Sequence, residues 1–117
     1  GVLKQAYPSG RNVDQELVDL LLRPSQQPGA TESFRGFVNL FNDWLAPQLL
    51  EQLRVPVRLL WGAQDPWEPL EEAQRWQQAH ACIQELTVLE GLGHCPHDES
   101  PEQVNPILLH WLQLGWR

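Results

Sequence analysis

Two apolar runs of strand length, joined by one stretch of helical length, constrain the fold of this chain more than any other feature. The first run, Val55 to Gly62, leads to Asp65, and the second, a strand predicted from about Gln84 to Leu89, leads to His94. A single helical crossover makes two such strands parallel neighbours in one sheet. Both polar residues then lie at the same edge of the sheet, where open α/β folds bind their ligands. The predicted fold class is therefore α/β.

Two further helices are predicted in the second half of the chain. The apolar spacing between Pro69 and His80 is typical of a helix with one buried face, and this helix is the crossover. Ser100 and Gln103 form a capping pattern at the start of a final helix. Pro106 lies inside the apolar pattern of that helix and predicts either a kink or a late start.

The first half contains helices and loops but no predicted strand. We expect a first helix that Asn12 caps and Arg23-Pro24 ends, with its leucines turned inward. Thr31 is expected to cap a second helix with a bulky apolar face. The residues of that face are Phe34, Phe37, Val38, Phe41, Trp44 and Leu45. A core-facing position is the simpler explanation of this face, and a short helical piece from Pro47 to Leu53 follows it.

Asp65 and His94 are the candidate catalytic residues. A histidine that transfers protons needs an exposed ring nitrogen and a carboxylate that fixes its tautomer, and positions just past strand ends favour both. Taken alone, an aspartate before Pro66 often forms a turn, and a histidine in a glycine-rich loop is often structural. Gly91 and Gly93 permit the torsions of a sharp turn before His94, but they equally fit an ordinary turn. The matched strand ends favour catalysis.

A metal site is the alternative interpretation of the run His-Cys-Pro-His-Asp at residues 94–98. Zinc ligands usually come from two separated pairs, whereas the other candidates, His80, Cys82 and His110, are scattered along the chain. We therefore predict no metal and no cofactor. Cys95 neighbours the candidate base instead of facing it, which argues against a thiol nucleophile.

Charge and composition exclude several classes of partner. A formal net charge of -7 without a basic cluster argues against nucleic acid. No apolar run has the length of a membrane span, and no basic and apolar leader opens the chain. Cys82 and Cys95 are expected to be free thiols in a reducing compartment, either cytoplasmic or plastid-like. The chain starts at Gly1, so we expect a fragment of a longer protein.

A nucleophile is missing from the pattern, because no serine lies in a G-x-S-x-G elbow and no HGGG-type oxyanion loop occurs. From residue 53 onward the chain nevertheless resembles the C-terminal part of an α/β-hydrolase fold protein. The matching segments are Val55-Pro56-Val57, Trp61-Gly62-Ala63-Gln64-Asp65-Pro66-Trp67, Gly93-His94 and Ser100-Pro101-Glu102. Asp65-Pro66-Trp67 and the stretch from Gly93 to Glu99 are similar, more narrowly, to the plant and cyanobacterial branch that includes pheophytinase-like esterases.

The resemblance implies that the chain consists of two parts with different roles. Residues 1–53 correspond to a helical cap and residues 54–117 to the last part of the hydrolase core, which needs the rest of that core as its partner. Because the family order is nucleophile, acid, histidine, Asp65 is the implied acid and His94 the implied base, with a serine upstream of Gly1. The implied substrate is a small molecule, a carboxylic ester with an apolar portion. The isolated chain is expected to show no turnover.

Three alternatives stay open at this point. An upstream aspartate nucleophile, as in haloalkane dehalogenases and epoxide hydrolases, would use the same acid and histidine. A binding module could have kept the hydrolase core and lost its chemistry. A short protein could complete its two-stranded sheet by self-association, because unpaired sheet edges favour such pairing.

Overall fold

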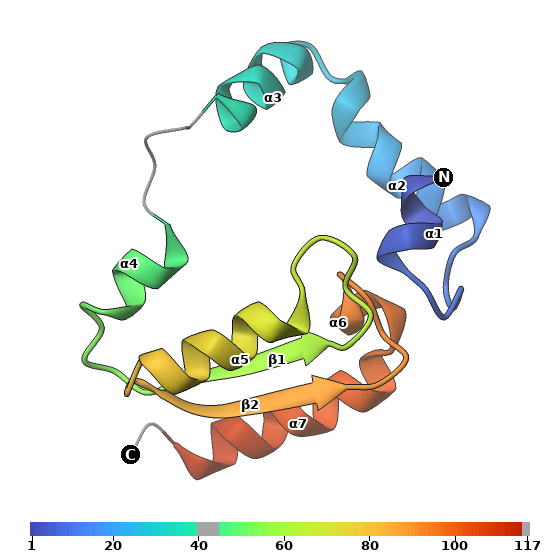
Figure 1. Ribbon diagram of the computed structural model, residues 1–117. Coiled ribbons are helices and arrows are strands. Elements are labelled where there is room, and N and C mark those ends of the chain that lie inside the picture. The colour runs from blue at the N-terminus through green and yellow to red at the C-terminus, as the bar shows by residue number, and fades with distance from the viewer. Residues whose placement is uncertain (40–44, 116–117) are drawn as a thin grey trace.

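The two predicted strands form a parallel pair in the computed structural model, which describes residues 1–39 and 45–115 (Figure 1). Strand β1 spans Val57–Gly62 and strand β2 spans Ile83–Leu89. Their register aligns Gly62 with Leu89, so both strands end at the same edge. The parallel arrangement predicted from the sequence is confirmed.

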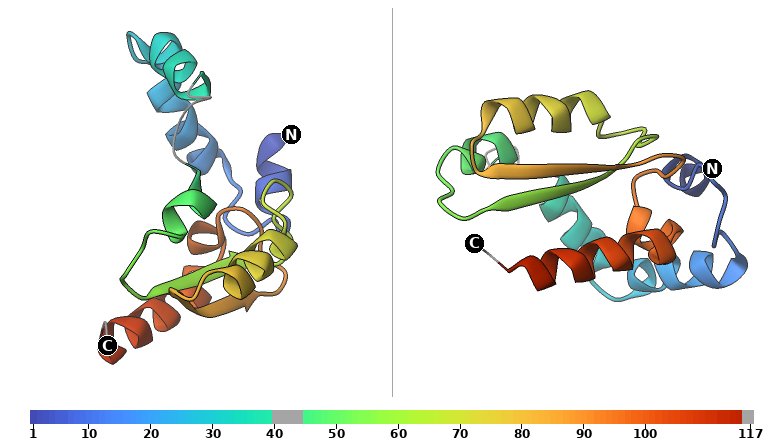
Figure 2. Two further views of the ribbon diagram at one scale, coloured as in Figure 1. Left: turned by 60° about the vertical axis from the view of Figure 1, so that its left-hand side comes forward. Right: turned by 90° about the horizontal axis from the view of Figure 1, so that it is seen from below.

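Helices cover both faces of this small sheet. Helix α5, Leu70–Ala79, lies on one face as the crossover, and helix α7, Pro101–Leu114, lies on the other, as the view from below shows (Figure 2). The indole rings of Trp61 and Trp76 meet edge to face, with centroids 5.9 Å apart, and join β1 to α5. Between the sheet and α7, the apolar core consists of Leu60, Leu89, Leu92, Val104 and Ile107.

Pro106 lies inside α7 without ending it. The helix begins at Pro101, directly after Ser100, as the capping pattern predicted. The late start that Pro106 allowed is therefore wrong. Proline lacks an N–H, so the helix loses one backbone hydrogen bond at this turn and still continues for two more turns.

Short helices make up the first half. They are α1 (Val2–Ala6), α2 (Gln15–Leu22), the 3-10 helix η1 (Arg23–Gln26), α3 (Ala30–Val38) and α4 (Ala46–Leu50). The predicted cap of the first long helix was wrong. Asp14 caps α2 by accepting a hydrogen bond from the Leu17 N–H at 2.8 Å. Asn12 has a left-handed backbone (φ 57°) and donates its side-chain N–H to the Asp98 carbonyl oxygen.

Helices α2 and α3 extend away from the sheet as an arm (Figures 1 and 2). The predicted core-facing position of their apolar residues was wrong, because Phe34 and Phe37 are 65% and 72% exposed and Leu20 and Leu21 are half exposed. The two phenylalanine rings contact one another, with centroids 6.4 Å apart. Phe41 and Trp44 of the same apolar face lie outside the described residues. The second helix also begins earlier than predicted, with Gly29 instead of Thr31 at its N-cap.

No helix within residues 1–39 and 45–115 has the length and apolar character needed to cross a bilayer.

Candidate functional site

The Asp65 carboxylate is fixed by the turn that follows β1. Its Oδ1 atom accepts hydrogen bonds from the backbone N–H groups of Trp67, at 2.9 Å, and Glu68, at 3.1 Å. An aspartate that bonds the backbone two and three residues ahead forms its own turn, so the sequence Asp-Pro-Trp-Glu builds this geometry locally. The second oxygen, Oδ2, is left free to meet another group.

That group is His94. The distance from its Nδ1 atom to Asp65 Oδ2 is 2.9 Å, so the convergence predicted from the two strand ends is confirmed. The Asp65 side chain is only 7% exposed, whereas the His94 side chain is 39% exposed. No hydrogen bond to Nε2 occurs within the part of the chain that the structure describes. The imidazole is therefore held at one nitrogen and open at the other.

Trp67 adds a second contact to the imidazole. Its ring lies edge to face with the His94 ring, with centroids 4.8 Å apart and an interplanar angle of 77°. The same residue donates its backbone N–H to Asp65, so one tryptophan orients both members of the pair.

The loop before His94 is wedged between two backbone segments. Gly91 has a φ of 77°, the left-handed torsion that glycine adopts at low cost, as predicted. Gly93 serves another purpose, which the sequence analysis did not identify. A Cβ atom at Gly93 would lie 2.4 Å from the Ala6 carbonyl oxygen, and one at Gly62 would lie 2.0 Å from the Gly93 carbonyl oxygen. Only residues without a side chain permit this packing.

Electrostatics favour the charged form of Asp65. Burial acts to raise the pKa of its carboxyl group, but the N–H groups of Trp67 and Glu68, together with His94, outweigh burial and hold this pKa below its ordinary value of 3.8. The carboxylate is therefore the form that accepts hydrogen bonds in the folded protein.

This lowered pKa predicts an acid-labile contribution to stability. Asp65 binds a proton more weakly in the folded than in the unfolded chain, so its contribution is present above pH 3.8 and is lost as the pH falls through the lower folded-state pKa. Urea unfolding measured between about pH 5 and pH 2 should show the free energy of unfolding falling less steeply in Asp65→Asn than in the wild type. If the free energy of unfolding depended equally on pH in both proteins, the lowered pKa would not belong to Asp65.

The pair borders a small hollow of about 190 Å³, which is also lined by Trp61, Glu68 and Pro96. This volume is below that of a usual small-molecule site. A larger hollow of about 840 Å³ lies on the α2–α3 arm, where Leu21, Phe34 and Phe37 line it. The candidate pair borders the smaller hollow, and neither Asp65 nor His94 lines the larger one.

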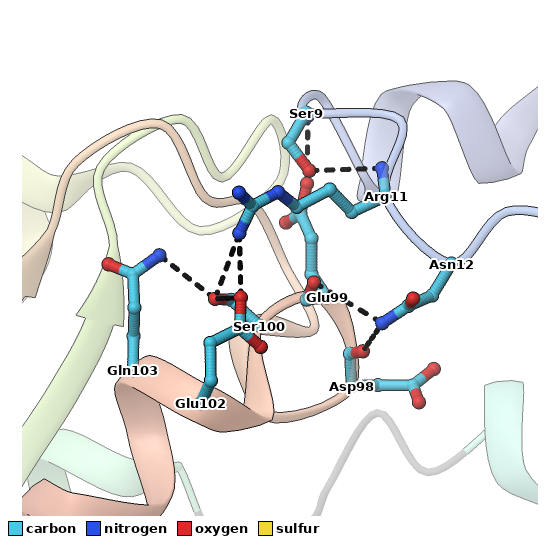
Figure 3. A network of polar contacts seen from close by, with 8 residues as sticks. All are labelled: Ser9, Arg11, Asn12, Asp98, Glu99, Ser100, Glu102 and Gln103. Carbon is cyan, nitrogen blue, oxygen red and sulfur yellow. Dashed lines mark hydrogen bonds and ion pairs between the residues drawn. The ribbon is translucent and has the colours of Figure 1, made fainter.

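A polar network that the sequence did not predict surrounds the buried residues Glu99 and Ser100 (Figure 3). Glu99 is 0% exposed, and its two oxygens accept hydrogen bonds from the backbone N–H groups of Ser9 and Gly93. Arg11 bonds Ser100 and forms an ion pair with Glu102 at 2.7 Å. Glu99 lies between Asp98 and Ser100, in a polar run typical of a helix start. Such residues are usually exposed, so the sequence gives no sign that Glu99 is buried.

Tyr7 also binds this region. Its hydroxyl group donates a hydrogen bond to Asp98 Oδ2 at 2.7 Å. Burial, followed by the bond to Asp98, raises the pKa of the Tyr7 phenol above its ordinary value, so Tyr7 stays a donor.

The other potential ligands lie apart. In the described ranges, no three His, Cys, Asp or Glu side chains gather in a way that could hold a metal ion. Cys82 and Cys95 are both free thiols, and the Cys82 thiol donates to the Leu50 carbonyl oxygen.

Comparisons with known proteins identify the family of this chain. Residues 3–107 match the model of the alpha/beta hydrolase family. A chloroplastic pheophytinase of Arabidopsis thaliana is 30% identical over 119 residues, covering 96% of this chain. The uncharacterized hydrolase YugF of Bacillus subtilis (strain 168) is 29% identical over 104 residues, covering 86% of this chain.

The chain spans 24% of the length of the first relative and 37% of the second. No solved structure matches the chain. The family match includes both strands, the crossover helix, Asp65 and His94. This protein therefore belongs to the alpha/beta hydrolase family.

Proposed function

We propose that Asp65 and His94 are the acid and the base of a serine hydrolase whose nucleophile lies outside these 117 residues. The observation that carries the proposal is the 2.9 Å contact between Asp65 Oδ2 and His94 Nδ1, at the shared edge of two parallel strands. An oriented imidazole with an open Nε2 is the arrangement that a hydroxyl nucleophile requires. We call the longer protein that carries these residues the intact protein.

The proposed reaction is hydrolysis of a carboxylic ester. The serine oxygen attacks the carbonyl carbon while His94 Nε2 takes the hydroxyl proton, and the Asp65 carboxylate stabilises the imidazolium that forms. Cleavage of the ester bond releases the alcohol, which receives this proton from Nε2. Water then attacks the acyl-enzyme with the same proton transfers, which frees the acid and restores the serine.

The proposed substrate carries an apolar portion, and the proposed cap is residues 1–53. The exposed phenylalanine and leucine side chains of the α2–α3 arm support this proposal, because clustered exposed apolar side chains mark binding surfaces. The apolar hollow lined by Phe34 and Phe37 would face the substrate when the rest of the core is present.

Asp65→Asn in the intact protein tests the role of the acid. The asparagine amide would donate to His94 Nδ1, which forces the remaining ring proton onto Nε2 and leaves no base for the nucleophile. We expect kcat for 4-nitrophenyl esters to fall by about 10³- to 10⁴-fold, with little change in KM. Asp98→Asn is the matched control, because Asp98 bonds Tyr7 instead of His94. A loss of less than tenfold in Asp65→Asn would assign the acid role to another carboxylate.

Active-site labelling, together with turnover of three substrate classes, separates the alternatives. A fluorophosphonate probe that labels a serine of the intact protein supports the esterase. Absence of labelling together with turnover of a haloalkane or epoxide indicates an aspartate nucleophile. Absence of any turnover with all three substrates indicates a binding module.

A further inference from the structure

We propose that Glu99 is a positioning residue for His94. Glu99 follows the histidine by five residues, and its carboxylate oxygens accept hydrogen bonds from the backbone N–H groups of Ser9 and Gly93. It acts on the backbone that carries the imidazole, and its kinetic consequence rests on the function proposed above.

The first step of the argument is the burial of Glu99. It is one of two polar residues with 0% exposure in the described part of the chain, although glutamate is rarely fully buried. A buried carboxylate requires hydrogen-bond donors, and Glu99 has two, one at each oxygen. The Gly93 N–H binds Oε2 at 2.7 Å and the Ser9 N–H binds Oε1 at 2.8 Å.

The second step is where these donors lie. Gly93 directly precedes His94, and Ser9 lies 90 residues before Glu99 in the chain. The next amide of the loop, that of His94, donates to the Ala6 carbonyl oxygen at 2.9 Å. The backbone N–H groups of Gly93 and His94 are thus both fixed. Glu99 binds the first, and the segment of residues 6–9, which Glu99 holds through Ser9, binds the second.

The third step is steric. The Gly93 Cα packs so closely on Ala6 and Pro8 that no side chain fits, and the carbonyl oxygen of Gly93 faces Gly62 at the end of β1. The loop is held between β1 and the segment of residues 6–9. Glu99 bridges that segment and the loop, so it sets the position from which His94 reaches Asp65.

Substitution by glutamine separates this role from simple space filling. Glutamine has the same shape but only one acceptor oxygen, so its NH₂ group must face the N–H of either Ser9 or Gly93. Glu102→Gln is the matched control. Glu102 also joins the two chain segments, through its ion pair with Arg11, but it is exposed and its hydrogen-bond partners are Arg11 and Ser100.

Three quantities are measured: the Nδ1–H signal of His94, amide exchange at Gly93 and Ser9, and kcat compared with KM. In the intact protein labelled with ¹⁵N-histidine, the Nδ1–H proton of His94 is assigned by its loss in His94→Ala. In Glu99→Gln we expect this signal to broaden or vanish, and amide exchange at Gly93 or Ser9 to accelerate by about tenfold or more. We expect kcat to fall by about 10- to 100-fold while KM changes by less than about threefold. Glu102→Gln should leave all three unchanged.

Glu99→Asp decides the case in which Glu99→Gln does not fold. Aspartate keeps two acceptor oxygens but is one methylene shorter, so it reaches only one of the two donors. The proposal expects a weakened Nδ1–H signal with protected amides in β1 and β2. An unchanged Nδ1–H signal in a folded variant overturns the proposal. It is also overturned if, in both variants, the Nδ1–H signal is lost only when the amide protection of β1 and β2 is lost as well. If His94→Ala keeps turnover, the proposed function fails, whereas the NMR result for Glu99 still stands.

Discussion

His94→Ala is expected to lower kcat for ester hydrolysis in the intact protein by about 10⁵-fold or more, the largest loss of any single substitution in this chain. The imidazole is held by a carboxylate at one nitrogen and is open at the other. Removing it leaves the nucleophile without a base and the leaving group without an acid. KM should change little, since the ring is not expected to supply much ground-state binding energy.

The fold should survive this substitution. Because the His94 side chain is 39% exposed, we expect the free energy of unfolding to change by no more than about 1 kcal/mol. Added imidazole should restore part of the activity, because it can occupy the space of the missing ring and accept the proton. His97→Ala, an exposed histidine in α6 (Pro96–Glu99), is the matched control and should keep wild-type kcat. An unchanged rate in His94→Ala would eliminate the proposed base.

The sequence was sufficient for the parts of the fold that follow from local patterns. The apolar runs and the helical spacing between them fixed two parallel strands with Asp65 and His94 at one edge, and the structure confirms this arrangement. The capping pattern at Ser100 located the start of α7. These features depend on residues near one another in the chain, where apolar periodicity and helix-start signals can be recognised.

The rest depends on contacts between distant segments. Asn12 has the side chain of a helix cap, but its amide bonds the Asp98 carbonyl oxygen, so Asp14 caps the helix instead. Glu99 is buried only because residues 6–9 fold back onto the histidine loop and supply a donor. The apolar face of α3 has helical spacing whether or not a core covers it, and periodicity does not report what lies opposite.

Gly62→Ala is expected to destabilise the protein by about 3 kcal/mol and to disrupt the site at the same time. A Cβ atom at Gly62 would lie 2.0 Å from the carbonyl oxygen of Gly93 and 2.6 Å from that of Leu92. Both neighbours are backbone atoms, so no side-chain rotation relieves the overlap. The end of β1 and the histidine loop must move apart, which also separates Asp65 from His94.

The measurement is urea unfolding of the intact protein, where a loss of this size lowers the midpoint by roughly 1 to 3 M. Gly36→Ala is the control. Gly36 is an exposed residue of α3 with nothing within 4 Å of an added Cβ atom, so alanine should stabilise there by about 0.5 to 1 kcal/mol. If Gly62→Ala behaves like Gly36→Ala, the loop before His94 yields easily. The contact between Asp65 and His94 would then depend on the Asp65 turn alone, and a rigid loop would have no part in positioning the histidine.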